Sequence, residues 1–412
     1  MTIAIIISLC VLVLIAYVFD LTSSKTKIPS VILLLILGWL LRELVNYFSI
    51  IVPDLSPALP VLGTVGLILI VLEGSLELEF NPSKTPLIRK SFLNAMIPLL
   101  VLSFGLAWAF TLSGQPNYRH NLINAIPLCV ISSAIAIPTV RGLTQRNREF
   151  VVYESSLSDI LGVLLFNFIA LNENFGIFTF GQLGLQILLI IFISFLATIA
   201  LAFLLHRIEH HIKFIPLILL IILIYSVSKI YHLPGLIFIL IFGLFLGNLD
   251  ELKGSKWIDR LKPEELNEEV HKLKRLTIEG AFLIRALFFL LFGYVIDPPE
   301  LFNADTFAWA IGITTTIFIL RALILVLTGL PLLPLLFIAP RGLITILLFI
   351  SIDQSNSIPL VSRSLIIQVI VLTALVMMIG IMTNRTSEGG GFAGKKARRS
   401  KIKWKVENQP LK

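Results

Sequence analysis

Long apolar runs separated by short polar stretches make up most of the chain. A helix that spans a bilayer needs about 20 mostly apolar residues. Thirteen runs have roughly this length, and they are residues 2–18, 28–45, 59–78, 91–113, 120–142, 150–171, 182–205, 213–231, 233–249, 277–296, 304–329, 331–352 and 359–383. Strands of a membrane barrel would be shorter and would alternate between apolar and polar residues. The pattern therefore predicts an all-α polytopic membrane protein with about 13 transmembrane helices.

The composition excludes several classes of protein. Of the 412 residues, 57% are hydrophobic and 14% are charged, whereas a soluble domain carries about 25% charged residues. A single soluble core also stops growing well below this length. A soluble enzyme, a disulfide-stapled secreted module and a disordered chain are therefore excluded. The two cysteines show no metal-binding spacing, no nucleophile–base set is visible, and no cofactor is expected.

The positive charges predict the orientation in the membrane. The formal net charge is +8, but most Lys and Arg residues fall on one side of the thirteen predicted spans. The other side receives Arg42, Arg119, Lys229 and Arg363. Because cytoplasmic loops attract Lys and Arg, the N-terminus is predicted outside and the C-terminus inside. The same distribution argues against nucleic acid as a partner.

Two polar stretches lie between or after the spans. Residues 250–276 carry charges of both signs and are predicted to be a cytoplasmic loop with an amphipathic helix from about residue 263 to 276. Residues 384–412 form a basic tail. The tail could bind anionic membrane lipid, or it could be a plain orientation signal, which the general positive-inside rule favours.

Two spans contain helix breakers in mid-membrane. Run 120–142 contains NAIPLCVISSAIAIPTV, with Pro127 and Pro138 on either side of a Ser pair, and run 331–352 contains Pro340 followed by Arg-Gly. Proline removes a helix hydrogen bond, and irregular backbone at membrane depth must face protein or a water-filled cavity. Independent proline kinks are the simpler alternative.

The broken runs occupy equivalent positions in two halves of the chain. They are the fifth and twelfth spans, so they predict two inverted six-helix repeats, about 2–171 and 213–383, joined by a linker helix at 182–205. Paired broken helices indicate a transporter's binding site. Together the repeats form one transmembrane domain over residues 1–383.

Asp159 is the most central acidic residue and the first candidate for ion binding. It lies about nine residues into run 150–171, with Ser155 one helical turn before it and Ser158 adjacent. Ser132, Ser133 and the carbonyls freed at the first break supply further oxygens, which hard cations prefer. Since burial favours the neutral form of a carboxyl group, Asp159 can hold a proton or release it and bind Na⁺ or K⁺. The alternative is a structural hydrogen bond or ion pair between helices.

Other charges within the spans predict a supporting network. Glu73 either lines an inner access path or snorkels to the interface. Glu154 lies five residues before Asp159, about 140° around the helix, so the two acids do not share a face. Glu154 is the natural partner for one of three intramembrane arginines, and the sequence leaves open which one; they are Arg285, Arg321 and Arg341. Arg341 could also cap carbonyls freed at Pro340.

Six segments together resemble the monovalent cation:proton antiporter superfamily. In chain order they are IPSVILLLILGWLLR, LILIVLEGSLELEF, SSAIAIPTVRGL, ESSLSDILGVLLF, IRALFFLLFGYVID and APRGLITILL. The resemblance implies that Asp159 is the ion- and proton-binding carboxylate. It also implies that Ser155 and the groups around Ser132 and Ser133 complete the cation shell, and that Glu73 approaches this site. The charge network of Glu154 and the three arginines would hold the broken-helix core together.

The resemblance also carries expectations about the whole protein. Members have a dimerisation domain beside a core domain that moves as an elevator, and they are typically homodimers. The expected location is the plasma (inner) membrane of a prokaryote. Potassium-efflux relatives often carry a cytoplasmic nucleotide-binding domain, and none is expected in the tail here.

Two departures from the family pattern bear on cation choice and stoichiometry. Ser158 stands where electrogenic members carry a second acid and many sodium exchangers carry Asn. Ala134 stands where those exchangers have the Asp of a Thr-Asp pair. The choice between Na⁺ and K⁺ is therefore open, and one-for-one electroneutral exchange is expected from a single site acid.

Two other functions compete with antiport. A sodium-coupled symporter of an organic anion would need a second cation site and a polar substrate cavity, and the spans offer one central acid. A membrane receptor or scaffold would explain the hydrophobicity but not two matching broken helices and a buried Asp. Secondary antiport is the predicted function.

Overall fold

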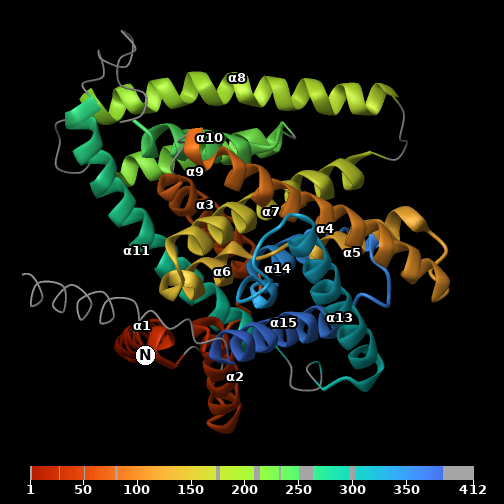
Figure 1. The fold of residues 1–412 in the computed structure, drawn as a ribbon. Coiled ribbons are helices and arrows are strands. Elements are labelled where there is room, and N and C mark those ends of the chain that lie inside the picture. The colour runs from red at the N-terminus through yellow and green to blue at the C-terminus, as the bar shows by residue number, and fades with distance from the viewer. Residues whose placement is uncertain are drawn as a thin grey trace, which may run out of the picture.

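The computed structural model describes residues 2–26, 28–50, 52–78, 82–172, 177–207, 214–231, 233–249, 263–296, 300 and 302–383. Every regular element within these ranges is a helix (Figure 1). The α-helices are α1 (Thr2–Thr26), α2 (Ser30–Tyr47), α3 (Ala58–Glu77), α4 (Thr85–Leu112), α5 (Tyr118–Cys129), α6 (Ser133–Thr139), α7 (Gln145–Leu171), α8 (Ile177–Arg207), α9 (Phe214–Ile230), α10 (Gly235–Gly247), α11 (Pro263–Val295), α13 (Ala304–Leu327), α14 (Leu343–Ile350) and α15 (Arg363–Thr383). Short 3₁₀ turns include η1 (Pro82–Lys84) and η4 (Leu335–Phe337).

Each predicted run coincides with a helix or with a broken helix. Among the described residues, 9 helical segments are long and apolar enough to cross a membrane, with α5 and α6 counted as one. Three shorter apolar helices lie at 7–22, Phe214–Ile230 and Gly235–Gly247. The remaining run, 331–352, is the second broken segment, formed by η4 and α14. The prediction of an all-α polytopic membrane protein is confirmed.

The helices pack in two groups. The core group consists of α4, α5, α6, α7, α13, α14 and α15, in which α4 packs on α5 and α7, and α13 packs on α4 and α15. The scaffold group consists of α2, α3, α8, α9, α10 and α11, in which α11 packs on α2 and α3, and α10 packs on α3 and α8. Helix α3 also contacts α6, α7 and α14, so it forms the boundary between the groups. In Figure 1, α8 runs along one edge beside α9 and α10, and α13 and α15 lie on the opposite side.

Glycines allow the closest packing within the scaffold group. A Cβ atom at Gly38 on α2 would lie 2.1 Å from the carbonyl oxygen of Leu290, and one at Gly293 on α11 would lie 2.3 Å from the carbonyl oxygen of Leu35. The two helices therefore touch backbone to backbone, as membrane helices do where small residues face each other.

The amphipathic helix predicted at about 263–276 is part of a longer element. Helix α11 begins at Pro263, where the sequence predicts a helix start, but it continues without interruption to Val295. Leu266, Val270 and Leu273 are buried along one face, so packing extends the transmembrane helix beyond its apolar run. The rest of the mixed-charge loop, residues 250–262, and the basic tail, 384–412, lie outside the described residues.

Candidate functional site

The first broken helix consists of α5 and α6, which are separated by a short extended stretch. Helix α5 ends at Cys129, residues 130–132 are extended, and α6 begins at Ser133, so the break lies between the two prolines of this run. Backbone N–H groups in the extended stretch find partners on other elements. Ile131 N–H donates to the Ser158 hydroxyl oxygen at 2.9 Å, and Ser132 N–H donates to the Pro340 carbonyl at 2.9 Å. The break is therefore held by α7 and by the second broken segment.

The second broken helix meets the first at Gly342. Between η4 and α14 the chain is non-helical, and a Cβ atom at Gly342 would lie 2.6 Å from Ile135 Cδ1 and 3.0 Å from Ser132 Oγ. A side chain here would require the Ile135 and Ser132 side chains to shift. Together with the Ser132–Pro340 hydrogen bond, this contact joins the two breaks at one point inside the protein.

Arg341 satisfies carbonyl groups of both broken helices. Its guanidinium is 1% exposed and donates to the carbonyls of Leu128 at 2.8 Å, Cys129 at 3.2 Å and Ala339 at 2.9 Å. The first two are orphan carbonyls at the C-terminal end of α5, where a positive charge is favourable. The sequence predicted that Arg341 could cap carbonyls freed at Pro340. Two of its three carbonyl acceptors belong instead to the first broken helix, which lies near Arg341 only in the folded chain.

Asp159 lies at the same crossing and is 0% exposed. Its Oδ2 accepts a hydrogen bond from the Ser133 hydroxyl at the start of α6. Its Oδ1 has no hydrogen-bond partner among the described residues, and neither does the buried hydroxyl of Ser132. A buried polar atom without a partner is costly. These oxygens can be satisfied by a proton on the carboxylate or by a bound cation.

The two predicted serine ligands on α7, Ser155 and Ser158, are engaged elsewhere. The Ser155 hydroxyl donates to the Val151 carbonyl of its own helix at 2.8 Å, and the Ser158 hydroxyl oxygen accepts from Ile131 N–H. The structure thus brings Asp159, Ser133 and Ser132 together and turns Ser155 and Ser158 toward backbone groups. Their roles as cation ligands stay predictions.

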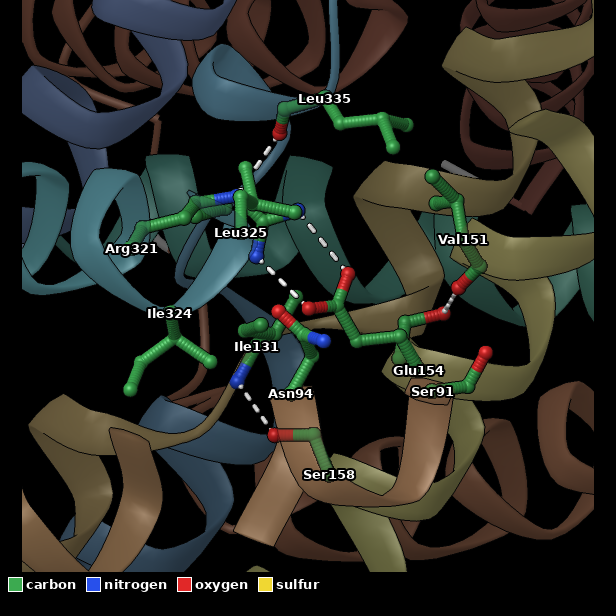
Figure 2. A network of polar contacts seen from close by, with 12 residues as sticks. Ser91, Asn94, Ile131, Val151, Glu154, Ser158, Arg321, Ile324, Leu325 and Leu335 are labelled. Carbon is green, nitrogen blue, oxygen red and sulfur yellow. Dashed lines mark hydrogen bonds and ion pairs between the residues drawn. The ribbon is translucent and has the colours of Figure 1, made fainter. Parts of the chain in front are cut away.

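Glu154 forms a buried ion pair with Arg321, which answers the question of partner that the sequence left open (Figure 2). Arg321 Nη1 and Nη2 lie 2.9 Å from Glu154 Oε1 and Oε2, and Arg321 Nε donates to the Leu335 carbonyl of η4 at 2.8 Å. The planar guanidinium matches the carboxylate at both oxygens. The pair therefore links α7, α13 and the second broken segment.

Glu73 and Arg285 lie inside the protein, on α3 and α11. Glu73 is 6% exposed, which disfavours snorkelling to the membrane interface, and Arg285 is also buried. Their predicted roles in an access path and in the charge network stay predictions.

One positioning residue escaped the sequence analysis. Arg119, predicted only as a loop charge, donates to the carbonyls of Ile169 at 3.2 Å, Ala170 at 2.8 Å and Asn172 at 3.0 Å. It therefore caps the C-terminal end of α7, the helix that carries Asp159. No pattern near residue 119 indicates this, since its acceptors lie about 50 positions later in the chain.

The donor set of the crossing consists of carboxylate, hydroxyl and carbonyl oxygens. Within the described ranges, no three His, Cys, Asp or Glu side chains come together in an arrangement that could hold a metal ion. Oxygen donors on two interrupted helices, beside one buried acid, are the arrangement of an ion-coupled membrane transporter.

The family of sodium/hydrogen exchangers (transmembrane) matches residues 10–388. The chain belongs to this family. It is therefore a multi-pass membrane transporter that performs cation/proton antiport, and the resemblance inferred from the six motifs is confirmed.

Solved structures show the same fold. Two structures of the sodium proton antiporter MjNhaP1 from Methanocaldococcus jannaschii are similar, each at 18% identity over 92% of this chain. The structure of that protein at pH 8 has a TM-score of 0.60 and is covered over 96% of its length; a structure from electron microscopy has a TM-score of 0.65 and is covered over 95%. No match is found among curated protein sequences.

Proposed function

We propose that this chain exchanges Na⁺ or K⁺ for H⁺ at Asp159, one for one, by alternating access. The observation that carries the proposal is the buried Asp159 carboxylate at the crossing of two broken helices, with one oxygen held by Ser133 and the other without a protein partner among the described residues. The protonated acid and the carboxylate with a bound monovalent cation have the same charge. Proton and cation therefore compete for one group.

The surrounding residues supply further oxygen ligands for the cation and support the broken segments. Ser132 Oγ, also without a partner among the described residues, lies at the crossing and is available as a ligand. Ser155 and Ser158 have hydroxyl oxygens that can accept a cation in addition to their present bonds. Arg341 and the Glu154–Arg321 pair keep the broken segments in place while the occupant changes.

The packing supports two inverted repeats. If α2 corresponds to α10 and α3 to α11, the contact of α2 with α11 is equivalent to the contact of α10 with α3, and both are present. The contact of α4 with α7 is likewise equivalent to that of α13 with α15. We further propose that the N-terminus lies outside, that the protein is a homodimer, and that it lies in the plasma membrane of a prokaryote.

The test is exchange by purified protein in proteoliposomes. Uptake of radioactive sodium and of radioactive rubidium, as a substitute for potassium, is followed together with a pH dye inside the vesicles. Cation uptake with matching proton release is expected, and the isotope that is taken up identifies the cation. Uptake without proton movement would contradict the proposal and favour a symporter.

Asp159→Asn is expected to abolish exchange while the protein still folds, because Asn imitates the protonated acid permanently. Thr314→Val is the control, since Thr314 lies on α13 within the core group, is buried, and its hydroxyl has no hydrogen-bond partner among the described residues. Its exchange rate should match that of the wild type. Near-normal exchange by Asp159→Asn would refute the mechanism.

A further inference from the structure

A cavity of about 370 Å³ lies at one end of the boundary between the core and scaffold groups. Its wall includes Asn167 on α7, Tyr225 and Lys229 on α9, and Asp353 just after α14. Three of these four residues are exposed and Tyr225 is buried. In the proposed orientation, α7 ends on the extracellular side, so the cavity opens there.

The cavity follows the face of α7 that carries Asp159. Val163 and Asn167 line the cavity and lie four and eight residues after Asp159, so all three share one helix face. Val163 is one turn, about 6 Å, from Asp159 along the helix axis. Buried apolar side chains also line the cavity, among them Leu67, Ile160 and Leu347.

At the opposite end, α3 closes tightly on α7. A Cβ atom at Gly74 on α3 would lie 2.9 Å from Ser156 Oγ on α7. One turn further, Glu77 Oε2 at the end of α3 lies 3.2 Å from Arg148 Nη2 near the start of α7. The two helices are therefore in contact at the cytoplasmic end and separated by the cavity at the extracellular end.

We propose that this cavity is the extracellular access route of the cation and that the Glu77–Arg148 ion pair is the latch that holds the cytoplasmic side closed. The inference rests on the proposed function. Glu77 belongs to the scaffold group and Arg148 to the core group, so their ion pair crosses the boundary at which the two groups must shift. It forms in the outward-open state and breaks when the core group moves to expose Asp159 to the cytoplasm.

A second ion pair nearby provides a matched control. Lys84 Nζ lies 2.9 Å from Glu149 Oε1, one residue beyond Arg148. Lys84 directly precedes α4, which packs on α7 within the core group. This pair joins elements that move together, so its loss does not favour either state.

The test measures how fast a cysteine at position 167 reacts with a membrane-impermeant cationic methanethiosulfonate. The background protein carries Cys10→Ser, because Cys10 is exposed, and it keeps Cys129, because Cys129 is buried. The background protein without Asn167→Cys is the control for labelling at any other position. Asn167→Cys should react from the extracellular side of sealed vesicles and not from the cytoplasmic side. Exchange by each variant is measured in parallel, so that a failure of antiport itself is seen separately.

Glu77→Gln should slow extracellular labelling of Asn167→Cys by about two- to five-fold, the range expected for one partly exposed ion pair. The reversed pair, Glu77→Arg with Arg148→Glu, should restore the rate, and Lys84→Gln should leave it unchanged. Labelling only from the cytoplasmic side, or none from either side, in a protein that exchanges ions would overturn the access route. An equal effect of Glu77→Gln and Lys84→Gln, or no effect of Glu77→Gln, would overturn the latch.

Discussion

Two acidic residues five positions apart on α7 have different environments. Asp159 faces the crossing of the broken helices and keeps one oxygen without a partner among the described residues, whereas both oxygens of Glu154 are held by Arg321. Glu154 and Arg321 are 1% and 4% exposed. A buried carboxylate that is fully paired can stabilise the fold, and one that is half satisfied can exchange its occupant. This difference supports the proposal that Glu154 is the structural acid and Asp159 the transport acid.

Glu154→Ala is expected to destabilise the protein strongly. Removing one partner of a buried pair leaves the other charge unpaired, which costs about 3–5 kcal/mol. Its melting temperature in detergent should therefore fall further below the wild-type value than that of Asp159→Asn. The double variant Glu154→Ala with Arg321→Met is the control, and it should recover part of the loss because no buried charge remains alone. A stable but inactive Glu154→Ala protein would mean that the two roles are assigned to the wrong acids.

The sequence predicted the separation of these two acids but not their partners. Their angular separation follows from the helical period alone, and it placed them on different faces. The partner of Glu154 lies 167 positions away, on a different helix. Three buried arginines were equally possible from the sequence, because nothing local records which helices become neighbours. Arg119 illustrates the same limit, since its role at the end of α7 exists only in the folded chain.

At the scale of elements, the apolar runs predicted the helices and the prolines predicted the breaks. The apolar runs predict the membrane-spanning helices well, because such a helix must cover the thickness of the bilayer with apolar residues. Helix α11 is the exception, since it includes the amphipathic residues 263–276 before its apolar run, and these are held by packing of Leu266, Val270 and Leu273. The contacts between the breaks, such as Ser132 N–H to Pro340, pair backbone groups that carry no sequence signal.

Gly38→Ala is expected to destabilise the contact of α2 with α11. The added methyl group would lie 2.1 Å from the Leu290 carbonyl oxygen, and because backbone cannot turn away as a side chain can, the helices must separate. Such overpacking costs about 1–3 kcal/mol.

Gly105→Ala on α4 provides the comparison for this substitution. In the part of the chain that the structure describes, a Cβ atom there meets nothing within 4 Å, and Ala favours a helix by up to about 1 kcal/mol relative to Gly. In detergent, the melting temperature of Gly38→Ala should fall and that of Gly105→Ala should stay level or rise. Equal effects of the two substitutions would show that α2 and α11 do not pack as closely as described.

At the scale of the whole molecule, the charge balance of the core decides how exchange responds to the membrane potential. Among the residues that the structure describes, two arginines lie buried in the core group. The Arg341 guanidinium donates to the neutral carbonyls of Leu128, Cys129 and Ala339, and Arg321 is balanced by Glu154. A guanidinium keeps its charge at any ordinary pH, unlike a lysine amine, which titrates readily when buried. In the proposed alternating-access cycle these fixed charges would move out and back, so their net displacement would be zero. Only the exchanged ions contribute to charge transfer.

The last prediction is that the equilibrium of exchange does not depend on voltage. One carboxylate, Asp159, is neutralised by one proton or by one monovalent cation, and Ser158 and Ala134 stand where a second acid could have been. A membrane potential is worth about 2.3 kcal/mol per net charge moved per 100 mV, and this contribution vanishes when one positive charge replaces another. In proteoliposomes with a diffusion potential of either sign, set by a permeant anion, the cation ratio at equilibrium should equal the proton ratio. Glu73 is a further buried acid, on the boundary helix α3, so if the equilibrium point shifts with voltage, Glu73→Gln is the variant to compare. Loss of the shift in that variant would identify Glu73 as a second proton carrier and replace one-for-one exchange with an electrogenic cycle.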